Sequence, residues 1–107
     1  MTVFVVQENN RLDYSPAEEF GDVVFMTAEE YKPVKSSLRN VEILQRIRAM
    51  MRTFDPERDY LVLTGNPVAI GFAFHLAASR YNSFRCLQWD RFSGQYKQLM
   101  FENPERR

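Results

Sequence analysis

The sequence predicts a small α/β domain: a single mixed sheet of about five strands with two main helices, in the order β-β-α-β-α-β-β. Short runs rich in β-branched and aromatic residues recur along the chain, and two longer segments have helical spacing or composition. Asp, Asn, Gly and Pro separate these segments. With 107 residues, 45% of them apolar, the chain is long enough for one core and too short for two. We therefore expect residues 1–107 to form a single domain.

The N-terminal part of the chain predicts two strands with one helical turn between them. Residues 2–7 (Thr-Val-Phe-Val-Val-Gln) and 22–27 (Asp-Val-Val-Phe-Met-Thr) have the composition of strands. Residues 15–21 (Ser-Pro-Ala-Glu-Glu-Phe-Gly) place Pro and acidic residues at the start of a helical turn and Gly at its end.

An amphipathic helix is predicted from Ser37 to about Phe54. Its apolar residues step by three and four, which places them on one stripe of the helix: Leu38, Val41, Leu44, Ile47, Met51 and Phe54. The helix is expected to end at Asp55-Pro56, because the ring of a proline disfavours the helical conformation of the residue before it.

A central strand and a second helix follow. Residues 59–64 form a short apolar run, which is typical of a strand covered on both faces. A turn at Gly65-Asn66-Pro67 leads into a helix over residues 68–81, which is apolar around much of its circumference and is therefore expected to be substantially buried. Strand-helix-strand units of this length favour parallel neighbours with right-handed crossovers.

The C-terminal part predicts a hairpin and a tail. Residues 84–89 and 95–102 read as strands, and residues 90–94 place Asp and Gly where a tight turn needs them. The hairpin would add an antiparallel edge to the sheet. The polar residues 103–107 are expected to be loose.

Composition excludes several classes of protein. The apolar runs are far shorter than a membrane-spanning helix needs, and the N-terminus lacks the features of a secretory signal, so we expect a cytoplasmic protein with no membrane partner. Cys86 and His75 are the only residues of their types, so zinc bound by Cys and His ligands is not expected. We expect no cofactor and no enzyme, because no group of candidate catalytic residues stands out.

The net charge is zero, but the charge is unevenly distributed. Residues 1–30 hold seven acidic residues and one Arg, and the rest of the chain has an equal excess of basic residues. The acidic segment could fold back onto the basic one. Alternatively, the protein has an exposed bipolar surface, or an acidic face that imitates nucleic acid.

A candidate ligand site lies where the predicted central strand meets the second helix. Thr64, Gly65 and Asn66 stand at the carboxyl end of that strand and at a helix N-terminus, where backbone N–H groups and the helix dipole favour an anion. The segment matches neither a dinucleotide-binding glycine motif nor a phosphate loop. The alternative is that Gly65 relieves the turn, Asn66 caps the helix, and Gly71 allows close helix–sheet packing.

Two further sets of residues are candidates for binding. Three aromatic residues around the hairpin could contact a protein partner, or could cover the edge of the core: Trp89, Phe92 and Tyr96. Four arginines of the first long helix could contact nucleic-acid phosphates, or could form a solvated helix face: Arg39, Arg46, Arg48 and Arg52. We interpret His75 and Cys86 as structural residues.

Two segments resemble small uncharacterised α/β proteins encoded by bacteriophages: residues 60–71 (Tyr-Leu-Val-Leu-Thr-Gly-Asn-Pro-Val-Ala-Ile-Gly) and 87–96 (Leu-Gln-Trp-Asp-Arg-Phe-Ser-Gly-Gln-Tyr). The resemblance covers the C-terminal half, and the acidic N-terminal segment adds nothing to it. It implies a phage accessory or host-takeover protein in the bacterial cytoplasm, and it brings no activity or catalytic residues.

These observations favour a non-enzymatic protein interaction module, which self-associates or binds a host or phage protein. A binder of a nucleotide or phosphate ligand at residues 64–67 is one alternative. Nucleic-acid binding through the Arg-bearing helix 37–54 is the other.

Overall fold

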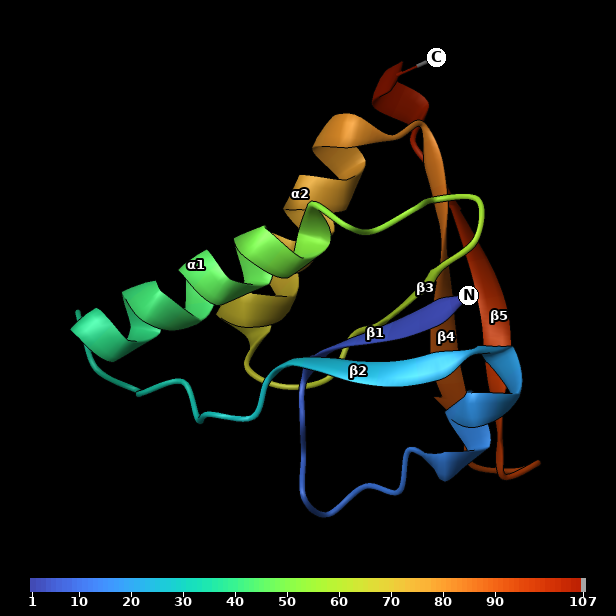
Figure 1. Ribbon diagram of the computed structural model, residues 1–107, viewed down its shortest axis with the longest axis horizontal. Helices are drawn as coiled ribbons and strands as arrows, with labels where there is room; N and C mark the ends of the chain where they lie inside the picture. The colour runs from blue at the N-terminus through green and yellow to red at the C-terminus, as the bar shows by residue number, and fades with distance from the viewer. Residues whose placement is uncertain (107) are drawn as a thin grey trace.

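The computed structural model describes residues 1–106, which form one five-stranded sheet with two long helices (Figure 1). The strands are β1 (Thr2–Gln7), β2 (Asp22–Thr27), β3 (Tyr60–Val62), β4 (Ser83–Asp90) and β5 (Gln95–Glu102). The helices are α1 (Leu38–Met51) and α2 (Pro67–Arg80), with short 3₁₀ helices η1 (Ser15–Phe20) and η2 (Pro104–Arg106). The predicted mixed α/β sheet and the order of its elements are confirmed.

The strands lie in the order β2-β1-β3-β4-β5. The first four are parallel to one another, and β5 returns antiparallel to β4 as the second strand of a hairpin. Strand β3 pairs with β4 only as far as Val62 opposite Leu87, so the end of the β4–β5 hairpin extends past the end of β3. This mismatch in strand length leaves room beside the hairpin.

Both long helices cover the same face of the sheet. Phe4 and Val6 of β1 belong to the core beneath α1 and α2, whereas Val3 and Val5 contact the region of η1 on the opposite face. Successive side chains of a strand point to opposite faces, so this continuously apolar strand supplies both cores. The face opposite the long helices carries η1 and the loop that precedes it.

The prediction of an apolar stripe on α1 is wrong for the N-terminal end of the helix. Leu38 is 80% exposed and Val41 is also exposed, whereas Asn40 is buried together with Ile43, Ile47 and Met51. The Asn40 side chain accepts a hydrogen bond from the Lys32 N–H (2.7 Å) and donates one to the Lys32 carbonyl (2.9 Å). This pair of bonds turns Asn40 inward, so Leu38 and Val41 face outward.

Helix α2 is less buried than its composition predicts. Its fully buried side chains are the small ones at every fourth position (Ala69, Ala73 and Ala77), and the larger apolar residues around them are partly exposed. Small residues at this spacing let the helix lie close to the sheet. No helix within residues 1–106 has the length and apolar character needed to cross a membrane.

The C-terminal residues are held more tightly than expected. Asn103 is buried, its N–H donates to the Asn82 carbonyl (2.8 Å), and its side-chain amide donates to the Ala78 carbonyl (3.1 Å). The prediction of a loose tail from residue 103 is therefore wrong at its start, because Asn103 fastens the end of β5 to the end of α2. Arg107 lies outside the described residues.

Candidate functional site: the carboxyl ends of β1, β3 and β4

The turn after β3 is tied to the end of β1. Gly65 has a φ of 117°, and a Cβ atom there would lie 2.4 Å from the Gln7 side chain. The Thr64 hydroxyl donates to the Gln7 carbonyl (2.8 Å) and lies 3.1 Å from the Tyr14 hydroxyl. Gly65 is thus required both by its backbone conformation and by the close approach of β1.

The polar groups at the start of α2 are used within the protein. The Asn66 N–H donates to Oε1 of Gln7 (2.7 Å), and Oδ1 of Asn66 accepts the Val68 N–H (2.8 Å) as a helix cap. These bonds favour the capping interpretation of Thr64, Gly65 and Asn66 over a ligand site. The expected packing role of Gly71 is wrong, because Gly71 is exposed and a Cβ atom there would meet nothing within 4 Å.

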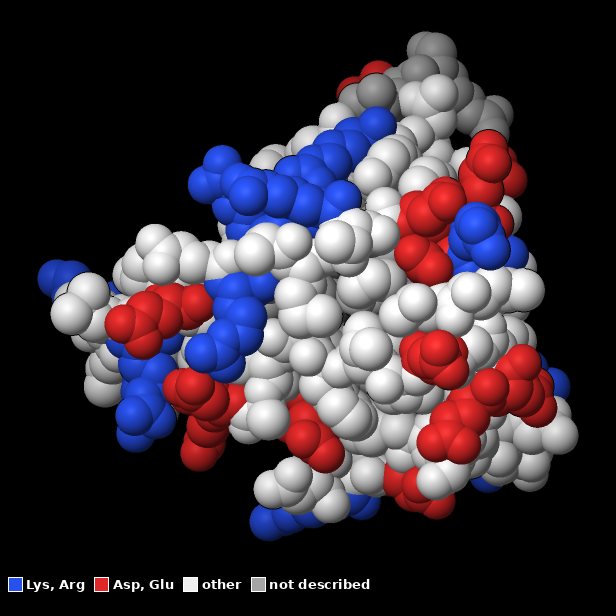
Figure 2. Space-filling model, in the orientation of Figure 1, with Lys and Arg blue, Asp and Glu red and all other residues white. Residues whose placement is uncertain are grey.

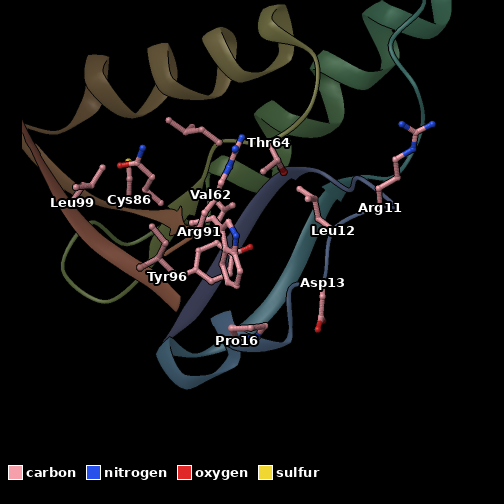
Figure 3. Close-up of a pocket in the computed structure, with 14 residues that line it drawn as sticks. Arg11, Leu12, Asp13, Pro16, Val62, Thr64, Cys86, Arg91, Tyr96 and Leu99 are labelled. Carbon is pink, nitrogen blue, oxygen red and sulfur yellow. The ribbon is translucent and has the colours of Figure 1, made fainter. Parts of the chain in front are cut away.

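A pocket of about 720 Å³ lies beside this turn (Figure 3). Three parts of the chain line it: the loop after β1 with Leu12, the end of β3 with Val62 and Thr64, and the β4–β5 hairpin with Trp89 and Tyr96. Figure 3 shows that Leu12 and Tyr96 reach the pocket from different sides. The sequence marks the hairpin aromatics, but it does not show that the loop after β1 lies near them.

Trp89 and Tyr96 form one aromatic pair, and Phe92 stands apart from it. The rings of Trp89 and Tyr96 lie edge to face, with centroids 5.1 Å apart. Tyr96 is buried, which raises the pKa of its hydroxyl, and nearby Tyr14 and Asp13 raise it further. Phe92, in the hairpin turn, is fully exposed. The structure therefore brings two of the three predicted partner-contact residues together.

The hairpin also carries exposed apolar side chains beyond Trp89 and Phe92. Leu99 is 46% exposed and Met100 is 53% exposed, and both lie on β5, which is an edge strand of the sheet. Because they are consecutive in a strand, they point to opposite faces. An eight-residue edge strand with apolar side chains on both faces is a template for pairing with another strand.

The arginines of α1 do not form one free basic face. Arg39 and Arg46 both lie within ion-pair distance of Glu29, at 3.9 and 3.3 Å, whereas Arg48 and Arg52, in the last turn and at the C-cap of α1, are exposed. On the face shown in Figure 2, most of the visible basic side chains gather over the two helices, and most of the visible acidic side chains lie at the right of the view. Glu29 of the acidic N-terminal segment thus contacts two arginines of α1.

A protein-family model described as Phage Pam3 gp32-like protein matches residues 1–103. The chain belongs to this family. The resemblance to phage proteins is thereby confirmed, but its restriction to the C-terminal half is wrong, because the match includes the acidic N-terminal segment. No curated protein and no solved structure matches the chain.

In this Phage Pam3 gp32-like chain, neither His75 nor Cys86 belongs to a cluster of metal-binding side chains within the described residues. His75 is exposed on α2, with its Nε2 3.5 Å from the Ser79 hydroxyl. Cys86 is buried, which raises the pKa of its thiol to about 11 and keeps it protonated at neutral pH. Within residues 1–106, no three His, Cys, Asp or Glu side chains lie close enough together to hold a metal ion.

Proposed function

We propose that this phage protein is a non-enzymatic interaction module of the bacterial cytoplasm that self-associates through the free edge of β5. One observation carries the proposal: Leu99 and Met100 are both exposed, on opposite faces of the same edge strand. A partner that docks on one face of the sheet would cover only one of these side chains. A strand added alongside β5 would contact both, and would also bond the outward backbone groups of β5.

A second copy of the chain fits this edge. If two β5 strands pair antiparallel about a twofold axis at Leu99, Leu99 lies opposite its own copy and Met100 lies opposite Gln98. Lys97 then lies opposite Phe101, so no two like charges face each other. The net charge of zero leaves little long-range repulsion between copies.

Analytical ultracentrifugation tests this proposal. We expect the wild-type chain to sediment as a dimer of 12.7 kDa subunits at high concentration. Leu99→Lys and Met100→Lys should each shift the chain to monomer, because the first places two lysines opposite each other at the twofold axis and the second replaces an apolar side chain of the interface with a charge. Leu38→Lys is the matched control, since Leu38 is an exposed leucine on α1, and this variant should still dimerise.

The possible outcomes separate the modes of contact. If only one of the two β5 variants dissociates the dimer, the copies meet through one face and strand pairing is wrong. If the wild-type chain stays monomeric at every concentration, self-association is wrong. Circular dichroism of each variant checks that the lysine has not unfolded the chain.

Nucleic-acid binding through Arg39, Arg46, Arg48 and Arg52 stays an alternative prediction, and Arg48 and Arg52 are the two of these that make no ion pair with Glu29. It requires affinity for a short DNA duplex that falls with salt, with a slope that shrinks in the Arg48→Ala/Arg52→Ala variant. An interaction module that acts through β5 shows no such binding.

A further inference from the structure

The sheet topology places the pocket where open α/β sheets bind ligands. The connection that leaves β1 crosses one face of the sheet through η1, and the connection that leaves β3 crosses the other face through α2. Where two such connections diverge, a crevice opens outside the carboxyl ends of the strands. The pocket lies at this point, between the loop after β1, the end of β3 and the projecting hairpin.

The size and lining of the pocket suit a small apolar ring. A volume of about 720 Å³ lies within the ordinary range for small-molecule sites. Leu12, Val62 and Leu87 contribute apolar walls, and the edge-to-face pair of Trp89 and Tyr96 contributes an aromatic one. Trp89 is 43% exposed, so part of its indole remains open to contact.

The hydrogen-bonding groups of the pocket favour an anion. Within residues 1–106, no hydrogen bond or ion pair occupies the guanidinium groups of Arg11 and Arg91 or the indole N–H of Trp89. All three are donors. The one acidic group of the lining, Asp13, already accepts hydrogen bonds from the N–H (2.9 Å) and hydroxyl (2.7 Å) of Ser15. The pocket therefore has unused donors and a net positive lining.

We propose that this pocket binds a small aromatic anion, whose ring lies against Trp89 and whose anionic group contacts Arg91. Thr64 of the turn at residues 64–66 lies in the pocket wall, but the proposed contacts are made by Trp89 and Arg91, because Gln7 and Tyr14 occupy the polar groups of that turn. The lining also includes Leu99 of β5, and the arginine variants below test the site separately from self-association.

Nuclear magnetic resonance provides a direct test, because Trp89 is the only tryptophan and gives a single indole N–H signal. The probe is naphthalene-2-sulfonate. The comparison compounds are naphthalene-2-methanol, which has the ring without the charge, and inorganic sulfate, which has the charge without the ring. We expect a saturable shift of the indole signal with naphthalene-2-sulfonate, and affinity at least about tenfold weaker for each comparison compound.

Two arginine variants complete the experiment. Arg91→Ala should weaken naphthalene-2-sulfonate binding about tenfold, whereas Arg48→Ala, which removes an exposed arginine from α1, should leave it unchanged. Both side chains are exposed, so both variants should fold, as their backbone spectra will show. If naphthalene-2-sulfonate causes no saturable shift, or if either comparison compound binds as tightly as naphthalene-2-sulfonate, the proposed site is wrong. It is also wrong if the Arg91→Ala variant binds naphthalene-2-sulfonate as tightly as the wild-type chain does.

Discussion

Oε1 of Gln7 accepts a hydrogen bond from the backbone N–H of Asn66 at 2.7 Å, and Nε2 of Gln7 donates to the Glu29 carbonyl at 3.0 Å. One buried amide therefore joins the end of β1 to the start of α2 and to the segment after β2. It also places a protein oxygen near the helix N-terminus, where an anion would otherwise be favoured.

Gln7→Ala should lower the free energy of unfolding by about 1–3 kcal/mol, because it leaves a partly buried N–H and a partly buried carbonyl without partners. Urea denaturation measures the change. Gln45→Ala, at an exposed position of α1, is the matched control and should change stability by less than about 0.5 kcal/mol. Equal stability of the two variants would contradict this role of Gln7.

Two glycine variants should have opposite effects. Gly65→Ala should destabilise the chain by more than about 2 kcal/mol, because the φ of 117° is strained for alanine and the new Cβ atom would overlap Gln7. Gly71→Ala should stabilise it by about 0.5–1 kcal/mol, because the site is an exposed helix interior with open space. Thermal denaturation compares the two, and a stable Gly65→Ala variant would contradict the observed turn.

Nucleotides should not stabilise the chain through the turn at residues 64–66. A ligand at one hundred times its dissociation constant adds about 2.7 kcal/mol to the folded state, which a thermal shift assay detects easily. Since Gln7 and Asn66 already bond to the groups at this helix start, any shift that a nucleoside phosphate causes through the neighbouring pocket should persist in the Asn66→Ala variant. A shift that Asn66→Ala abolishes would establish the ligand site instead.

Cys86 should react slowly with iodoacetamide. Burial raises its thiol pKa from 9.0 to about 11, so at pH 8 the folded chain holds about one hundredth of the thiolate that the unfolded chain holds. Mass spectrometry of the native and urea-unfolded chain measures both rates. Equal reaction rates of the native and the unfolded chain would show that Cys86 is accessible.

The same pKa shift makes stability depend on pH. Because the thiol pKa is higher in the folded chain, the stabilisation from this group is fully present below pH 9 and is lost as the pH rises through 11.

Local sequence patterns predict the strands well, because the composition of each short run is enough to indicate a strand. The bounds of β1, β2 and β5 agree with the predicted ranges 2–7, 22–27 and 95–102. The rotation of α1 was mispredicted, because the bonds from Asn40 to Lys32 join residues whose pairing no apolar spacing reveals.

The candidate site was predicted only in part. The sequence singles out residues 64–66 and the hairpin aromatics, since turn formers and aromatics stand out locally. It gives no signal for Gln7, whose role depends on the parallel pairing of β1 with β3. The pocket depends on strand order as well, because only the fold brings Leu12 close to Trp89.

Hydrogen–deuterium exchange at low and high protein concentration tests self-association through β5 most directly. Strand pairing would bury the outward amides of residues 95–102, so these should exchange more slowly as concentration rises. The opposite edge strand, β2, is the internal control and should exchange at a constant rate. Exchange over residues 95–102 that does not depend on concentration, or added protection confined to other segments, would contradict the proposal.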